Sequence, residues 1–113
     1  MTGTHIILDI SNIIDNEKLK YGLTIIPIMN KIVQTFNLKV VANAFHQFTP
    51  YGFTAVYVLA ESHLSIHTFV EEKKVAIDLY TCGSFDKTKE LYELLKYEFG
   101  KDCEIHLKII ERK

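Results

Sequence analysis

The sequence predicts an α+β fold, a two-layer sandwich in which one mostly antiparallel sheet carries two helices on one face. Two observations predict it. Five strand-like runs are interrupted by two segments, 24–37 and 83–100, whose apolar residues recur at helical spacing. The resulting order is strand, helix, strand, strand, strand, helix, strand, which suggests one antiparallel or mixed sheet. We expect residues 1–113 to form a single domain.

The composition excludes several classes of protein. The formal net charge of -1 at pH 7 gives no electrostatic reason to expect nucleic acid or an anionic membrane as a partner. No apolar run approaches the ~20 residues of a membrane helix, and the alternating first residues, with His5 and Asp9, do not resemble a signal peptide. Two cysteines, Cys82 and Cys103, make no disulfide framework, so we expect reduced thiols in the cytoplasm.

The first half of the chain predicts a strand, a short turn or helix, and an amphipathic helix. The strand covers residues 3–10, and the turn covers 16–21 and ends at Gly22. Thr24 is a plausible N-cap of the helix, and Asn37 suits a left-handed position after its end. The apolar stripe of this helix consists of Ile25, Ile28, Met29, Ile32, Val33 and Phe36.

The second half predicts three strands, a helix and a last strand. The strands cover 39–49, 53–59 and 74–81, and the apolar run of the third suggests burial on both faces. The second helix begins at 83–86 and ends at Gly100, and residues 104–112 alternate as a strand. The inward residues of this second helix are Leu91, Leu94, Leu95 and Phe99. With both helices on one face, the other face of the sheet needs a cover, and self-association supplies it most simply.

The stretch 59–68 carries an unusual density of polar chemistry between two strand-like runs. It contains Ser62, His63 and His67, and Cys82 follows at the end of the next strand. Buried hydroxyls and imidazoles need hydrogen-bond partners that Leu or Val would not need. We therefore interpret Ser62, His67 and Cys82 as one site.

A serine in a tight turn can cut its own chain. The Ser62 hydroxyl attacks the Glu61 carbonyl carbon and converts the amide into an ester, after which a base removes the serine α-proton and β-elimination breaks the chain. The dehydroalanine left behind hydrolyses to a pyruvoyl group and ammonia. His67 is a chemically suitable base, and Thr54 and Ser65 supply hydroxyl donors.

Other interpretations of the same residues remain open on spacing alone. The stretch can be a polar loop whose histidines bind backbone carbonyls. A Ser-His-Asp hydrolase is disfavoured because no nucleophile-elbow glycines surround Ser62. A metal site of His63, His67 and Cys82 is a weak alternative, and we expect no metal.

Two motifs resemble the short prokaryotic S-adenosylmethionine decarboxylases: AESHLSIHT at 60–68 and AIDLYTCG at 76–83. Further matches are Gly3-x-His5 followed by Asp9, FTPYGFT at 48–54, and the chain length. The resemblance implies a proenzyme that cleaves between Glu61 and Ser62 into chains 1–61 and 62–113. It also implies a pyruvoyl cofactor made from Ser62, which forms a Schiff base with the substrate, and a homodimer with active sites at the interface.

The resemblance also implies roles for individual residues. His67 matches the processing base, Thr54 a processing hydroxyl, and Cys82 the proton donor of the decarboxylation. Phe48, Phe69 and Glu71 match the substrate-binding positions for S-adenosylmethionine, the precursor of the aminopropyl donor for spermidine.

One departure from the family leaves the substrate open. Phe69-Val70 stands where the family usually carries Trp-Pro. Pyruvoyl enzymes that decarboxylate arginine or ornithine are therefore an alternative. An unprocessed, non-catalytic family member is another.

Overall fold

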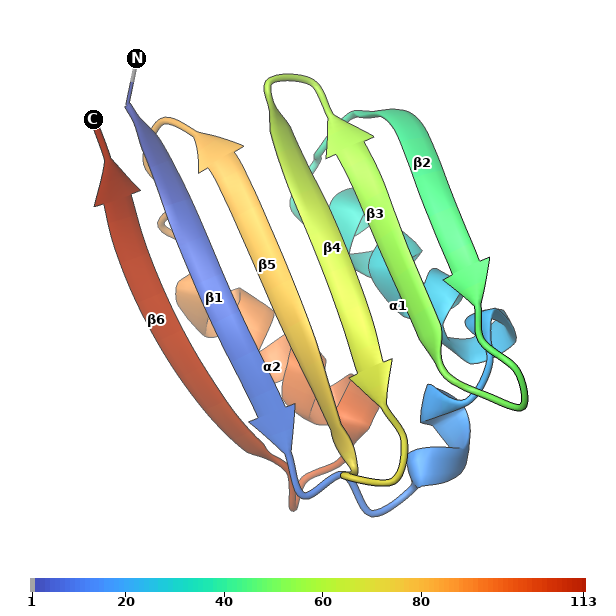
Figure 1. Cartoon of the computed structure of the whole chain (residues 1–113). Helices are drawn as coiled ribbons and strands as arrows, with labels where there is room; N and C mark the ends of the chain where they lie inside the picture. Colours follow the sequence, from blue (N-terminus) through green and yellow to red (C-terminus); the bar gives the residue numbers. More distant parts are fainter. Residues whose placement is uncertain (1) are drawn as a thin grey trace.

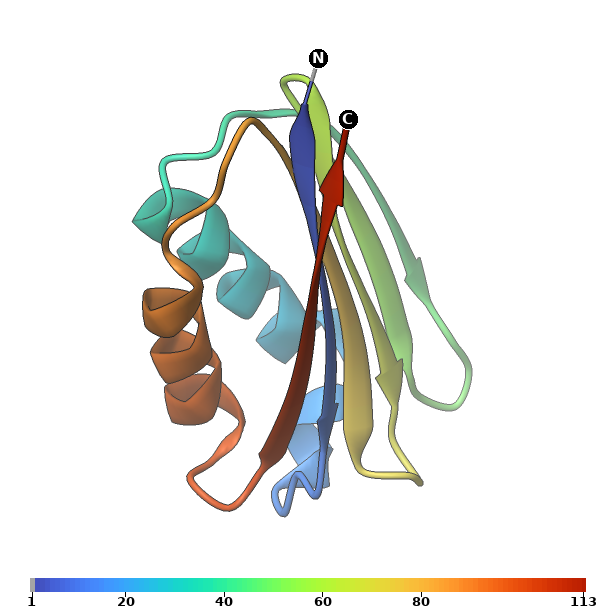
Figure 2. The same cartoon turned by 90° about the vertical axis from the view of Figure 1, so that its left-hand side faces the viewer.

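The computed structural model describes residues 2–113 and contains one six-stranded sheet with the helices on one face (Figures 1 and 2). The strand order is β2-β3-β4-β5-β1-β6, and every neighbouring pair is antiparallel. The predicted two-layer α+β class is thus confirmed. The elements in chain order are β1 (Gly3–Ser11), the 3-10 helix η1 (Asn16–Leu19), α1 (Gly22–Thr35), β2 (Val40–Gln47), β3 (Phe53–Leu59), β4 (Ser62–Phe69), β5 (Lys74–Cys82), α2 (Thr88–Phe99) and β6 (Glu104–Arg112).

The core lies between the sheet and the helices. The inward residues of β1, β3, β4 and β5 alternate with outward ones, as the period of a half-buried strand requires. The predicted stripe of α1 is buried except for Phe36, which is partly buried, and all four predicted inward residues of α2 are buried. Each fully buried Leu or Ile contributes about 1.5–3 kcal/mol, so this apolar layer holds the helices on the sheet.

One predicted loop is a strand. We expected five strands, with 59–68 as a polar connection, but residues 62–69 form β4 near the middle of the sheet. Buried and partly exposed side chains alternate along it, with Leu64 and Ile66 buried. The outward His63 and His67 made the segment look like a loop.

Three smaller predictions were also wrong. Helix α1 begins at Gly22 after Tyr21, and the Thr24 hydroxyl donates backward to the carbonyls of Lys18 and Tyr21 instead of capping the helix. Helix α2 begins at Thr88, after an extended segment that follows Gly83. Strand β5 buries one face only, because none of the described helices and strands packs on the other face. The left-handed position expected for Asn37 is confirmed, with φ of 56°.

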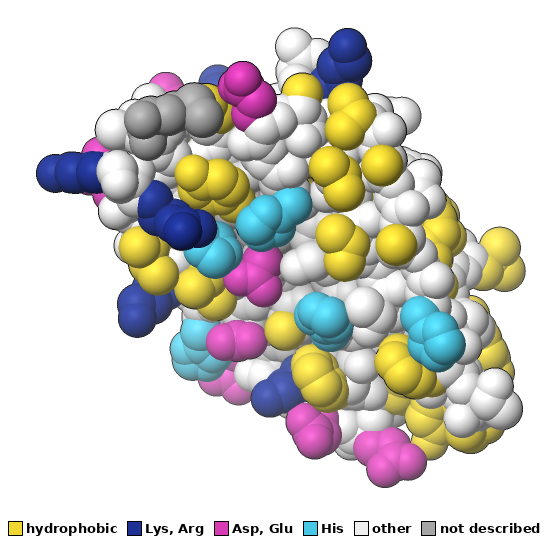
Figure 3. Space-filling model, turned by 45° about the horizontal axis from the view of Figure 1, so that its top comes forward, with side chains coloured by type: hydrophobic (Ala, Val, Ile, Leu, Met, Phe, Trp, Pro, Cys, Tyr) yellow, Lys and Arg dark blue, Asp and Glu magenta, His cyan; other side chains and the backbone are white. Residues whose placement is uncertain are grey.

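The face of the sheet opposite the helices, called here the open face, is uncovered. Polar and apolar side chains are mixed on it, with histidines beside hydrophobic groups (Figure 3). Val58 and Ile110, which pair with outward residues of β4 and β1, are 46% and 36% exposed. Strand register and alternation assign all five histidines of the chain to this face: His5, His46, His63, His67 and His106.

Within the described residues, no helix is long and apolar enough to cross a membrane.

Candidate active site

The Glu61–Ser62 bond lies in the tight hairpin between β3 and β4. Leu59 pairs with Ser62, so Ala60 and Glu61 form a two-residue turn. Glu61 has φ of 65°, a left-handed conformation that costs a residue other than glycine about 1–2 kcal/mol. The Ser62 hydroxyl is 3.5 Å from the carbonyl oxygen of Ala60, at the limit of a hydrogen bond. The backbone is therefore strained at the bond at which we predicted cleavage from the sequence.

Cys82 lies at the same end of the sheet as this hairpin (Figure 1). Because His63 pairs with Tyr80, the register places Glu61 opposite Cys82. Desolvation and then a hydrogen bond to the Glu61 carboxylate raise the pKa of the Cys82 thiol above its ordinary value. The thiol is consequently protonated at neutral pH, the state that a proton donor needs.

His67 and Thr54 lie at the opposite end of the sheet. They are register partners in β3 and β4, and the Thr54 hydroxyl is 3.1 Å from Nδ1 of His67. This bond orients the imidazole and leaves Nε2, which makes no hydrogen bond within residues 2–113, as the ring nitrogen available to a base function.

Within one chain, the structure does not bring His67 to Ser62. Five residues of extended strand separate them, which is about 17 Å at roughly 3.3 Å per residue. They also point to opposite faces, because Ser62 shares the helix-facing side with Leu64 and Ile66 while His67 lies on the open face. The predicted trio therefore divides: Ser62 and Cys82 lie at one end of the sheet, and His67 lies at the other.

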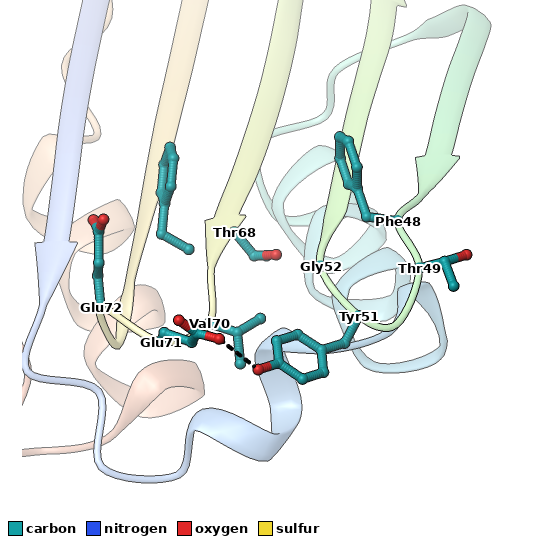
Figure 4. A pocket seen from close by; sticks show the side chains of 9 residues that line it. Phe48, Thr49, Tyr51, Gly52, Thr68, Val70, Glu71 and Glu72 are labelled. Atoms are coloured by element: carbon teal, nitrogen blue, oxygen red, sulfur yellow. Dashed lines mark hydrogen bonds between the residues drawn. The ribbon is translucent and has the colours of Figure 1, made fainter.

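The three predicted substrate-binding residues line one cavity. It has a volume of about 440 Å³ and lies between the β2–β3 turn and the β4–β5 turn (Figure 4). Phe48 and Phe69 are 47% and 41% exposed. The Glu71 carboxylate accepts a hydrogen bond of 2.8 Å from the Tyr51 hydroxyl, which raises the pKa of Tyr51. This cavity is at the same end of the sheet as His67, and its size is typical of a small-molecule site.

Sequence reasoning missed two features of the site. Tyr51 holds Glu71, and the only signal for it was its place in the turn before β3. On the open face, Nε2 of His5 lies 2.9 Å from the Asp78 carboxylate, and the His63 and Tyr80 rings pack beside His5. The outward alternation of β1 and β5 was the signal for this second cluster.

No three side chains of His, Cys, Asp or Glu within residues 2–113 gather as metal ligands.

The fold and the site together define a class: a two-layer α+β protein with a strained Glu-Ser hairpin, a protonated thiol across from it, and an aromatic cavity at the far end of the sheet. Comparison with known proteins identifies the family of this chain. The family model described as S-adenosylmethionine decarboxylase matches residues 4–113. The chain belongs to this family, and the predicted enzyme class, a pyruvoyl-dependent decarboxylase, is thereby confirmed.

Individual relatives match over nearly the whole chain. The S-adenosylmethionine decarboxylase proenzyme of Sulfurihydrogenibium sp. (strain YO3AOP1) is 39% identical over 110 residues, 97% of this chain and 81% of that protein. The proenzyme of Clostridium botulinum (strain Hall) is 35% identical over 107 residues, 92% of this chain and 90% of its own. A crystal structure of the adenosylmethionine decarboxylase from Aquifex aeolicus VF5 superimposes with a TM-score of 0.84 at 31% identity, covering 97% of this chain and 89% of that one.

Proposed function

We propose that this chain cuts itself between Glu61 and Ser62 and then decarboxylates S-adenosylmethionine. The observation that carries the proposal is the left-handed Glu61 in a two-residue hairpin, directly before the serine and opposite the Cys82 thiol. Breaking the 61–62 bond releases this strain. The name proenzyme, which the relatives carry, supports processing of this kind.

The cleavage needs no outside reagent except water. Oγ of Ser62 bonds to the carbonyl carbon of Glu61, the amide C–N bond breaks, and the hydroxyl proton moves to the freed amine nitrogen. A base then takes the α-proton of residue 62, and the bond from Cβ to the ester oxygen breaks with its electron pair leaving on the Glu61 carboxylate. The resulting enamine becomes an imine, which water hydrolyses to a ketone and ammonia. The products are a chain of residues 1–61 and a chain that begins with a pyruvoyl group.

The residues around Ser62 fit this group. A pyruvoyl group at this position would supply an electron sink for the decarboxylation. Cys82 is the proposed donor of a proton to the substrate α-carbon, and its raised pKa, which keeps the thiol protonated, supports this role. Cleavage also turns Glu61 into a chain end with a second carboxylate, which raises the pKa of Cys82 further. A working thiol must remain reduced, and the cytoplasm meets that requirement.

The cavity supports a nucleoside substrate. Phe48 and Phe69 offer exposed aromatic faces for an adenine ring or a sulfonium, and Glu71 retains lone pairs that can accept hydrogen bonds from ribose hydroxyls. The names of the relatives favour S-adenosylmethionine over arginine or ornithine. The product would serve spermidine synthesis as the aminopropyl donor.

A homodimer would complete the site. Ser62 and Cys82 lie at one end of the sheet, His67 and the cavity lie at the other end, and the proposed reaction needs both sets. In a two-fold dimer packed through this face, one end of each protomer can lie on the other end of its partner, which generates two equivalent sites. Covering the open face would also bury Val58 and Ile110.

Mass and carbon dioxide measurements test the proposal. Matured protein should give two chains split at 61–62, the second of which reacts with carbonyl-trapping reagents, whereas Ser62→Ala should remain one inactive chain. The processed protein should release carbon dioxide from S-adenosylmethionine. Release from ornithine or arginine alone would reject the substrate, and a single uncut wild-type chain would reject the self-processing enzyme.

A further inference from the structure

Thr81 carries the one buried side-chain oxygen within residues 2–113 that has no hydrogen-bond partner. The residue is 6% exposed, on the helix-facing side of β5. Burying a hydroxyl without a partner costs free energy that a methyl group at the same place would not cost. A dimer through the open face cannot satisfy this oxygen, because it lies on the other side of the sheet.

Ser62 is the residue across from this oxygen. His63 pairs with Tyr80, and one residue further along the antiparallel register Ser62 faces Thr81. Both side chains point to the helix side, and directly opposed residues of this kind have Cβ atoms about 4.5–5.5 Å apart. Within residues 2–113, the Ser62 hydroxyl has only its 3.5 Å contact with the Ala60 carbonyl. Two poorly satisfied hydroxyls thus face each other beside the strained bond.

Different steps of the cleavage can then take place on the two faces of the sheet. His67, on the open face, cannot be the group that orients Oγ of Ser62, because Oγ points to the helix side. It can approach the backbone of residue 62 from a partner protomer, which suits removal of the α-proton. On the helix side, Thr81 lines a cavity of about 360 Å³ together with Phe36 and Phe85.

We propose that Thr81 is a processing residue: its Oγ1 accepts a hydrogen bond from the Ser62 hydroxyl and holds Oγ over the Glu61 carbonyl carbon for the acyl shift. Rotation of the Ser62 side chain about its Cα–Cβ bond would make this bond in place of the contact with Ala60. The role precedes any bond breaking, so Thr81 acts on formation of the ester and not on the later elimination. This inference rests on the proposed self-cleavage.

The neighbouring Thr4 offers a matched control. It pairs with Thr81 across β1 and β5, has the same 6% exposure, and points to the same face. Its hydroxyl, however, donates a hydrogen bond of 2.8 Å to the Gly83 carbonyl. Replacing each threonine by valine therefore removes a satisfied hydroxyl at Thr4 and an unsatisfied one at Thr81, which should change stability in opposite directions.

The test follows cleavage of freshly synthesised full-length chain by denaturing electrophoresis and intact mass. Thr81→Val should slow cleavage by about 10- to 100-fold, the loss expected when a reacting group is misplaced by about 1 Å. Thr81→Ser should cleave at nearly the wild-type rate, as should Thr4→Val. The uncut Thr81→Val chains should resist hydroxylamine, because their 61–62 bond is still an amide.

Stability supplies the readout that a merely structural role would not reproduce. In the uncut Ser62→Ala background, adding Thr81→Val should leave the melting temperature unchanged or raise it, while adding Thr4→Val should lower it. Wild-type cleavage by Thr81→Val, equally slow cleavage by Thr81→Ser, accumulation of a hydroxylamine-sensitive ester, or a lowered melting temperature would each overturn the role of Thr81 while leaving self-cleavage in place. A wild-type chain that never cleaves would overturn both proposals.

Discussion

The two ends of the sheet differ in what they provide. At the hairpin end, Glu61, Ser62 and Cys82 combine backbone strain, a hydroxyl and a protonated thiol. At the cavity end, the Thr54–His67 pair and the aromatic cavity combine the proposed base with the proposed binding surface. In the proposed reaction, neither end has both the bond to break and the base with which to break it.

In the proposed enzyme, this difference would make the uncovered sheet face a functional surface. An isolated protomer would then have two half-sites about 17 Å apart along one strand, at roughly 3.3 Å per residue. A two-fold contact repeats each half-site on the partner, so one interface would build two complete sites. Covering the face would also remove water from the His5–Asp78 pair, which is 20% and 35% exposed in one chain.

The largest expected effect comes from mixing two inactive variants. Ser62→Ala lacks the nucleophile and His67→Ala lacks the base, so neither should cleave alone. Co-synthesised, they should form mixed dimers in which the His67→Ala chain meets an intact His67 from its partner, and about half of the His67→Ala chains should be cut if pairing is random. Intact mass identifies which chain is cut.

The control for this mixture is the double variant Ser62→Ala/His67→Ala. Mixed with His67→Ala, it supplies no imidazole and should restore nothing. Cleavage of His67→Ala chains by themselves would remove His67 from processing. No cleavage in the first mixture, despite confirmed mixed dimers, would contradict the division of the site between protomers.

A smaller but still large effect is expected at Cys82. Cys82→Ala should cut at or below the normal rate, since Ser62 is intact, and should lose most turnover, about 10²- to 10⁴-fold for the loss of a positioned acid. Carbon dioxide release by the processed protein measures it. Cys103→Ala is the control, because that thiol is buried in the core and should affect stability without affecting turnover. Full activity of Cys82→Ala would exclude it as the proton donor.

The pH dependence of turnover should sharpen the role of the hairpin end. A proton donor is lost as pH rises through its pKa, and the raised pKa of Cys82 therefore extends activity toward alkaline pH. Glu61→Gln removes the carboxylate that is its second cause, so the alkaline decline should begin at lower pH. Glu104→Gln, a change on the edge strand β6, should leave the profile unmoved. If Glu61→Gln left the pH profile of turnover unchanged, the Glu61 carboxylate would not be a cause of the raised pKa of Cys82.

The sequence predicted the layers of this fold well, because helical and strand periodicities differ clearly in α1, α2, β1 and β6. It failed at β4, where the outward positions carry histidines and a serine. These are typical of loops when the partner strands are unknown, and only the burial of Leu64 and Ile66 on the other side of the strand restores the pattern.

The candidate site shows the same limit. Residue types and motifs were enough to single out Ser62, His67 and Cys82, but their arrangement was not, because a strand separates residues by length and by face at once. Spacing of five along the chain suggested proximity in a turn, and in β4 it means opposite ends and opposite faces. For Tyr51 the only signal was its place in the turn before β3, and Thr81 had none, since the bond to Glu71 and the missing bond of Thr81 exist only in three dimensions.

The smallest expected effect is at Tyr51, in the cavity end. Tyr51→Phe keeps the ring and removes the hydroxyl that holds the Glu71 carboxylate, and a hydrogen bond of this type contributes about 1 kcal/mol or less at an exposed site. KM for S-adenosylmethionine should therefore rise about threefold, with kcat and chain cleavage unchanged. Tyr97→Phe, on the outer surface of α2, is the control. If Tyr51→Phe changed the rate of chain cleavage instead of KM, His67 would not be the only residue at the cavity end that acts in processing. Glu71 would then be assigned to the cleavage reaction.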